Sequence, residues 1–130
     1  MPITLKYIND GVGVEFVCSG LVTGAEIIEA NKEIYGTTEK ILKQKYQLID
    51  RTQCTEYHIT AEQMKNIAKQ DKEAAKHNST VIMVFVATNA QQFGVSRMWQ
   101  EHVGESGFLT KIFRNRKSAD KWLEQQLKKP

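Results

Sequence analysis

The feature of this chain that most constrains its fold is an uninterrupted apolar run at residues 80–87, TVIMVFVA. β-branched and aromatic side chains fill much of the run, and these residue types favour a strand. The run is far shorter than the ~20 apolar residues of a membrane-spanning helix. A strand without polar alternation is typical of a parallel sheet that is covered on both faces. The run therefore predicts a central strand with other elements packed on each side of it.

Two matched start signals predict long helices before this strand. Thr23 is followed by Glu26, and Thr60 by Gln63, at the three-residue spacing of a capping box. An apolar stripe of helical period follows each pair. We therefore expect one helix to begin after Thr23 and a longer one to begin after Thr60.

Further signals complete the order of the elements. Apolar stretches predict strands at residues 3–7, 12–18, 46–50 and 109–113, and helical periodicity predicts helices at about residues 90–103 and after Ser118, which is expected to be the cap. Residues 39–43 form a short amphipathic stretch that is not counted as an element. The resulting order, ββαβαβαβα, predicts a single α/β domain over residues 1–130, with a mixed, mainly parallel sheet and an antiparallel first hairpin. The expected core contains Val14, Phe16, Ile49, Ile67, Val81, Met83, Phe85, Trp122 and Leu123.

Positive charge is concentrated toward the end of the chain. Residues 106–130 hold seven Lys or Arg against two acidic residues, whereas the net charge of the whole chain is +3. No zinc-finger spacing or RNA-recognition motif accompanies these cations, so we interpret them as a solvated helix face and expect no nucleic-acid partner. The two cysteines, Cys18 and Cys54, are too few for a disulfide framework. Without a leader-like or membrane-spanning stretch, the expected location is the cytoplasm.

The richest chemistry lies at residues 50–60, DRTQCTEYHIT. We expect this segment to be a loop at the carboxyl end of the third strand, where open α/β sheets bind ligands. A thiol nucleophile needs a nearby base, so Cys54 activated by His58 defines an alternative function as a small enzyme. Turns and helix caps use the same residue types, and a role without catalysis is favoured.

No metal or cofactor is expected. Cys54 and His58 are four residues apart, but no second closely spaced Cys or His pair completes a zinc site. Gly11-Val12-Gly13 falls in the expected hairpin rather than before a helix, and the Gly-Lys-Ser/Thr signature of a phosphate-binding loop is absent.

The helix expected at about residues 90–103 brings further candidates to the same edge of the sheet. Met98 and Trp99 could form an apolar wall, with Arg97 as a polar anchor. His102 and Asp71 interrupt the apolar stripes of their helices. We expect each of them to find a hydrogen-bond partner rather than to bind a ligand.

Several segments together resemble the SpoIIAA-like proteins of the STAS class. These segments are GLVT at residues 20–23, the strand that ends in Asp50, FGVSRM at residues 93–98, IFR at residues 112–114 and SADKWL at residues 118–123. The resemblance covers nearly the whole chain. It implies a mixed sheet of four or five strands with helices on one side, and a switch or ligand-binding module that is not an enzyme.

The resemblance also implies a site. Anti-anti-sigma members are phosphorylated on a serine at the start of the helix after the third strand, and Thr60 is the nearest hydroxyl here, within HITA at residues 58–61. A similarity in outline to CRAL-TRIO lipid carriers implies a lipid-like ligand. We therefore expect a regulatory or binding module that engages a protein partner or a small apolar ligand, and leave a homodimer open. The expected site contains Asp50, Tyr57, His58, Thr60, Arg97, Met98 and Trp99.

Overall fold

A five-stranded sheet forms the centre of the computed structural model, which describes residues 2–104 and 107–129. The strands lie side by side in sequence order: β1 (Ile3–Ile8), β2 (Gly13–Thr23), β3 (Tyr46–His58), β4 (Ile82–Val86) and β5 (Leu109–Phe113). β1 and β2 are antiparallel, and the other neighbouring pairs are parallel. This mixed sheet confirms the predicted fold class.

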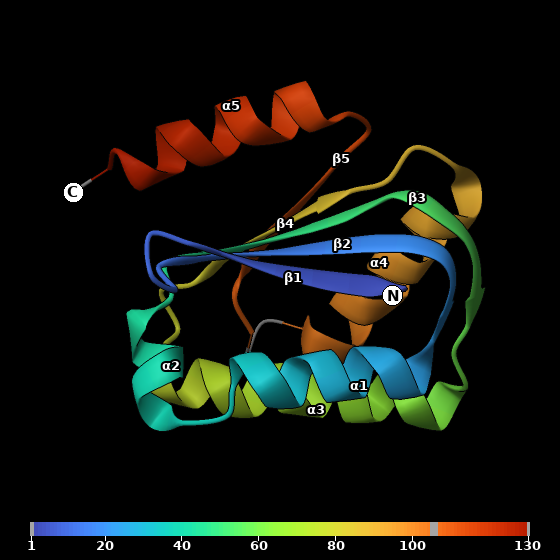
Figure 1. The fold of residues 1–130 in the computed structure, drawn as a ribbon, viewed down its shortest axis with the longest axis horizontal. Coiled ribbons are helices and arrows are strands. Elements are labelled where there is room, and N and C mark those ends of the chain that lie inside the picture. Colours follow the sequence, from blue (N-terminus) through green and yellow to red (C-terminus); the bar gives the residue numbers. More distant parts are fainter. Residues whose placement is uncertain (1, 105–106, 130) are drawn as a thin grey trace.

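Helices cover the sheet from both sides (Figure 1). α1 (Gly24–Ile34), α2 (Thr38–Lys43), α3 (Ala61–His77) and α4 (Ala90–Val103) lie on one side, and α5 (Arg116–Leu127) lies alone on the other. Parallel strands in sequence order with right-handed crossovers place the connecting helices on one face. No described strand follows α5, so no crossover in the described sheet constrains it, and the expectation of helices on one side only was wrong. In the part of the chain that the structure describes, none of the helices has the length and apolar character to cross a membrane.

β4 contributes to a separate core on each face of the sheet. Met83 and Phe85 belong to the larger core beneath α1, α3 and α4, whereas Val84 and Val86 pack toward α5. This arrangement confirms the double cover predicted from the apolar run.

Eight of the nine predicted core residues are buried, and Trp122 is the exception. Trp122 is only partly buried because it lies at the rim of the smaller core. There its ring packs against Phe113, with 5.8 Å between ring centres.

β3 is longer than predicted, so the loop expected at residues 50–60 was wrong. The strand continues to His58, and its outer half pairs with residues 19–23 of β2. Two register shifts place extra residues in β3, and Arg51, Cys54 and Tyr57 are all buried although they are three residues apart. The strand period of two is therefore lost, which explains the mistaken prediction.

The start of α5 also differs from the prediction. Asn115, not Ser118, is the N-cap, and its side chain accepts a hydrogen bond from the backbone N–H of Ser118 at 2.8 Å. The capping boxes predicted at Thr23 and Thr60 are both confirmed.

Candidate functional site

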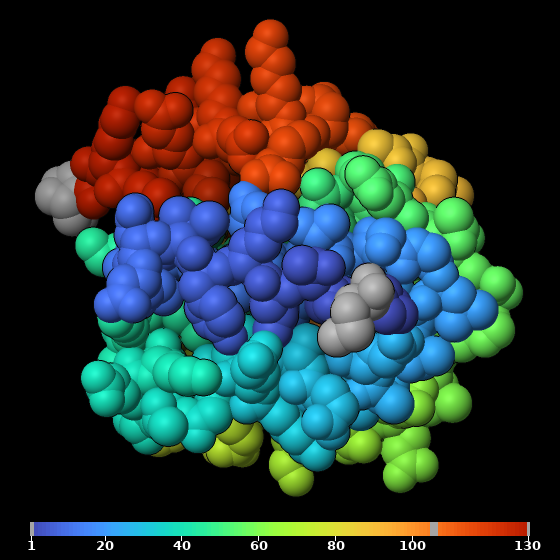
Figure 2. Space-filling view, viewed as in Figure 1, coloured from blue at the N-terminus to red at the C-terminus, as the bar shows by residue number. Residues whose placement is uncertain are grey.

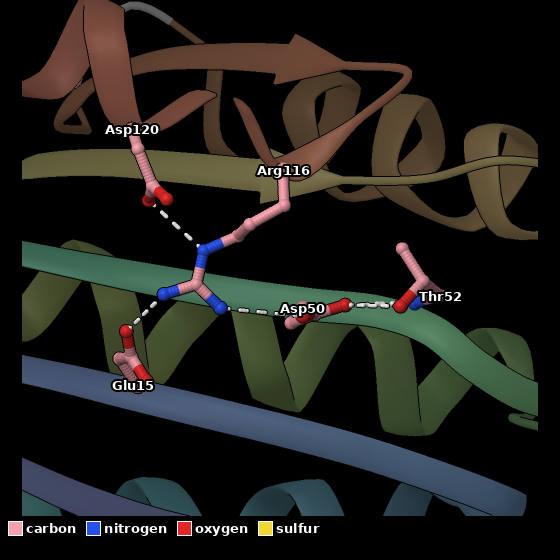
Figure 3. A network of polar contacts seen from close by, with 5 residues as sticks. All are labelled: Glu15, Asp50, Thr52, Arg116 and Asp120. Atoms are coloured by element: carbon pink, nitrogen blue, oxygen red, sulfur yellow. Dashed lines mark hydrogen bonds and ion pairs between the residues drawn. The ribbon is translucent and has the colours of Figure 1, made fainter. Parts of the chain in front are cut away.

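Asp50 lies on the α5 side of the sheet, in a charged cluster that joins α5 to β2 and β3 (Figure 3). Arg116, at the start of α5, binds Glu15 and also contacts Asp50 Oδ2 at 3.4 Å and Asp120 Oδ1 at 2.9 Å. Thr52 donates to Asp50 Oδ1 from its backbone N–H at 3.0 Å and from its hydroxyl at 2.7 Å. The cluster holds α5 against the sheet, and both oxygens of Asp50 are engaged in it.

Four of the other predicted site residues are exposed. Arg97 and Met98 lie on the outer surface of α4. His58 pairs with Glu56, with 2.7 Å between Nε2 and Oε1. Thr60 is the N-cap of α3, where its hydroxyl accepts the backbone N–H of Gln63. A role for these residues in ligand binding, or of Thr60 in phosphorylation, stays a prediction.

Tyr57 and Trp99 are buried on the side of the sheet opposite α5, and Arg51 links them. Arg51 is 6% exposed. Its Nη1 donates to the Tyr57 hydroxyl at 3.0 Å, and its Nε donates to Ser96 Oγ on α4 at 3.0 Å. The guanidinium lies 5.3 Å from the centre of the Tyr57 ring and 5.2 Å from that of Phe85. The Phe85 and Trp99 ring centres lie 5.0 Å apart with the ring planes tilted by 52°, so the four side chains form one continuous row of contacts.

No acidic side chain of residues 2–104 and 107–129 forms an ion pair with Arg51. Among the described residues, Arg51 forms no ion pair, and its hydrogen bonds are those to Ser96 and Tyr57, which leave Nη2 without a partner. Burial of a cation costs free energy unless the charge is paired or hydrogen-bonded. The two aromatic rings offset part of this cost. An anion beside Nη2 would offset more of it.

Asp71, on α3, is the second buried charge of this layer, with 2% exposure. Its Oδ1 accepts the Tyr35 hydroxyl at 2.7 Å, and its Oδ2 accepts Trp99 Nε1 at 2.6 Å. Burial raises the pKa of Asp71 to about 6, although these two hydrogen bonds act in the opposite direction. The expectation that Asp71 finds hydrogen-bond partners is confirmed.

A small cavity of about 40 Å³ lies between the sheet and the helices. Its walls are mainly apolar, with Ile67, Met83 and Phe85 among them, and Arg51 and Asp71 contribute charged groups. Gln47 also lines the cavity, and its Oε1 is buried without a hydrogen-bond partner. The volume suits a few water-sized groups. Apolar walls with a small number of polar groups are typical of a small-ligand site.

The Cys54 and His58 pair of the enzyme alternative is not assembled. Cys54 is buried, and its thiol donates to the backbone oxygen of Glu56 at 3.3 Å, whereas exposed His58 contacts the Glu56 carboxylate. Burial raises the pKa of the other thiol, Cys18, to about 11, which disfavours a reactive thiolate. Residues 2–104 and 107–129 also contain no group of three His, Cys, Asp or Glu side chains placed to hold a metal ion.

Sequence reasoning missed Arg51 and Gln47 as site residues. The sequence did carry a signal for Gln47, because it is the polar residue in an otherwise apolar buried stretch of β3, QLI at residues 47–49. Arg51 had none, because it fell in the segment expected to be a loop. Its burial depends on the longer β3 and on α4, which lies over it.

Comparison with known proteins supports the fold assignment. It gives no information about the site. No protein-family model and no curated protein matches the chain. The structure is similar to that of an uncharacterized protein from the DUF3478 family of Shewanella loihica PV-4, which has a SpoIIAA-like fold. The TM-score is 0.52 over 93% of this chain and 91% of the other, at 18% sequence identity. The chain therefore has a SpoIIAA-like fold, as the sequence resemblance predicted.

Proposed function

We propose that this protein is a non-catalytic binding module that takes a small, largely apolar carboxylic acid into the cavity beside Arg51. The observation that carries the proposal is the unpaired charge of Arg51, buried at 6% exposure against a mainly apolar cavity. A carboxylate can accept two parallel hydrogen bonds from a guanidinium. The free Nη2 and the remaining N–H of Nη1 suit that geometry.

The other cavity residues narrow the class of ligand. Met83 and Phe85 favour an aliphatic body. The unpartnered Oε1 of Gln47 favours a hydroxyl, because an acceptor in this position requires a donor. The 40 Å³ volume holds only a few water-sized groups, so even a short acid requires the cavity to enlarge, and a longer acid requires more enlargement. A short-chain hydroxy acid meets the other requirements with the least enlargement.

Titration with butyrate, 3-hydroxybutyrate and octanoate tests the proposal. Trp99 lines the cavity, so binding should change its fluorescence, and calorimetry gives an independent affinity. We expect saturable binding, tighter for 3-hydroxybutyrate than for butyrate. Arg51→Met should weaken it by about tenfold or more, since charge-assisted hydrogen bonds are worth about 1.5–3 kcal/mol.

Lys65→Met is the matched control, because it removes one positive charge from an exposed position on α3. It should bind like the native protein. Circular dichroism establishes that both variants are folded. Absence of saturable binding to the native protein, or equal binding by Arg51→Met, would refute acid binding at this cavity.

A further inference from the structure

A groove of about 700 Å³ runs along the free edge of the sheet, between β1 and α1. Ile3, Leu5 and Tyr7 of β1 line one side of it, and Glu29 and Glu33 are among the α1 residues on the other. Figure 2 shows β1 and α1 next to one another on the face turned to the reader. Ile3 lines both this groove and the Arg51 cavity. The binding argued here uses neither Arg51 nor Gln47, so it does not depend on the proposed function.

β1 presents unpaired backbone groups along this groove. The backbone N–H of Ser19 donates to the Pro2 carbonyl at 2.8 Å, which fixes the hydrogen-bonding phase of the antiparallel β1–β2 pair. Alternate residues of such a pair direct their backbone groups toward the partner strand. The N–H and C=O groups of Ile3, Leu5 and Tyr7 therefore point away from β2. β1 is the outermost strand of the described sheet, and a free edge of this kind is a template for a further strand.

The groove is acidic. Glu26, Glu29 and Glu33 line it, and none of the described lining residues is Lys or Arg. Glu29 pairs with Lys32, but both side chains are highly exposed, so the pair contributes little and leaves Glu29 available. Glu33 forms no ion pair with a described residue and lies beside Tyr7, whose pKa is raised by burial and by the Glu33 charge. A partner that carries positive charge would match this wall.

We propose that an extended basic segment of another protein binds here as a sixth strand. Its backbone would pair with Leu5 and its neighbours, and alternate Lys or Arg side chains would reach Glu29 and Glu33. The aliphatic stems of those side chains would cover the apolar part of the groove.

Two other occupants are disfavoured. A second copy joined through β1 would bring the α1 glutamates of both copies together, and like charges repel. The basic α5 of another copy is a helix, and it already buries Ala119 and Leu123 against the sheet. It is not available as a strand.

Fluorescence anisotropy and amide hydrogen exchange test the proposal with defined probes. The first probe is a fluorescein-labelled peptide of eight residues that alternates Arg with Thr, and the second has Glu in place of each Arg. We expect the Arg peptide to bind at physiological salt and to slow exchange of the Leu5 and Tyr7 amides. The Glu peptide should do neither.

A matched pair of charge variants distinguishes binding in this groove from general electrostatic attraction to the protein surface. Glu29→Lys with Glu33→Lys should weaken binding of the Arg peptide by about tenfold, as expected when two exposed ion pairs become repulsive. Glu62→Lys with Glu73→Lys changes the net charge equally on exposed positions of α3 and should have an effect below about twofold. Equal losses in both variants, or binding without protection of the β1 amides, would refute the proposal. So would sedimentation showing that the free protein self-associates through β1.

Discussion

Asp71 is a carboxylate that the fold removes from water while supplying two hydrogen-bond donors, Tyr35 and Trp99. Burial raises its pKa from 3.8 to about 6. Between these values the folded protein binds a proton that the unfolded chain has released, so the free energy of unfolding falls as the pH rises from about 4 to about 6. The loss attributable to Asp71 should be roughly 3 kcal/mol. Urea denaturation across this range should show the slope in the native protein and its absence in Asp71→Asn.

The pH dependence of tryptophan fluorescence provides a control for the assignment to Asp71. Trp99 donates its indole N–H to Asp71, so its fluorescence should titrate with a midpoint near the Asp71 pKa of about 6. Trp122 belongs to the core on the opposite face and should not follow this titration. The histidines are present in both proteins, so the difference between them isolates Asp71. An unchanged stability slope in Asp71→Asn would contradict the assignment.

The N-caps of α3 and α5 can each be tested by a single substitution. Thr60→Ala and Asn115→Ala should each lower the free energy of unfolding by about 1 kcal/mol, because each removes the acceptor of an N-terminal backbone N–H. Ser118→Ala should change it much less, since the Ser118 contribution to the cap is its backbone N–H. Urea denaturation distinguishes these outcomes. A larger loss in Ser118→Ala than in Asn115→Ala would mean that the cap is misassigned.

The elements that were predicted correctly carry their signals within a few residues. A capping box such as Thr60 with Gln63 satisfies its own hydrogen bonds, so its spacing alone reveals it. The outer half of β3 has no such local signal, because its register shifts arise from pairing with β2, far earlier in the chain. For the same reason the burial of Arg51 was missed, and with it the cavity. Long-range pairing, not local propensity, decides these features.

The two cores share β4, and this should make the whole molecule unfold in one step. Trp99 belongs to the core beneath α4, and Trp122 packs against the core beneath α5. In Trp122→Phe and in Trp99→Phe, the remaining tryptophan therefore reports on one face. Within each variant, the fluorescence and circular dichroism transitions in urea should coincide. If the Trp122 signal changed at lower urea than the dichroism, α5 would be an independently unfolding element.

The order of the strands in the sheet is also the order in which a ribosome delivers them. From β2 onward each strand pairs with the one synthesised before it, so its first partner is already present when it emerges. The helical layer can therefore assemble while the chain is still growing. α5 leaves the ribosome after all five of these strands, and until then Leu48, Val84 and Val86 form an uncovered apolar surface. Docking of α5 is thus the step that removes this surface from water and with it the need for protection from aggregation.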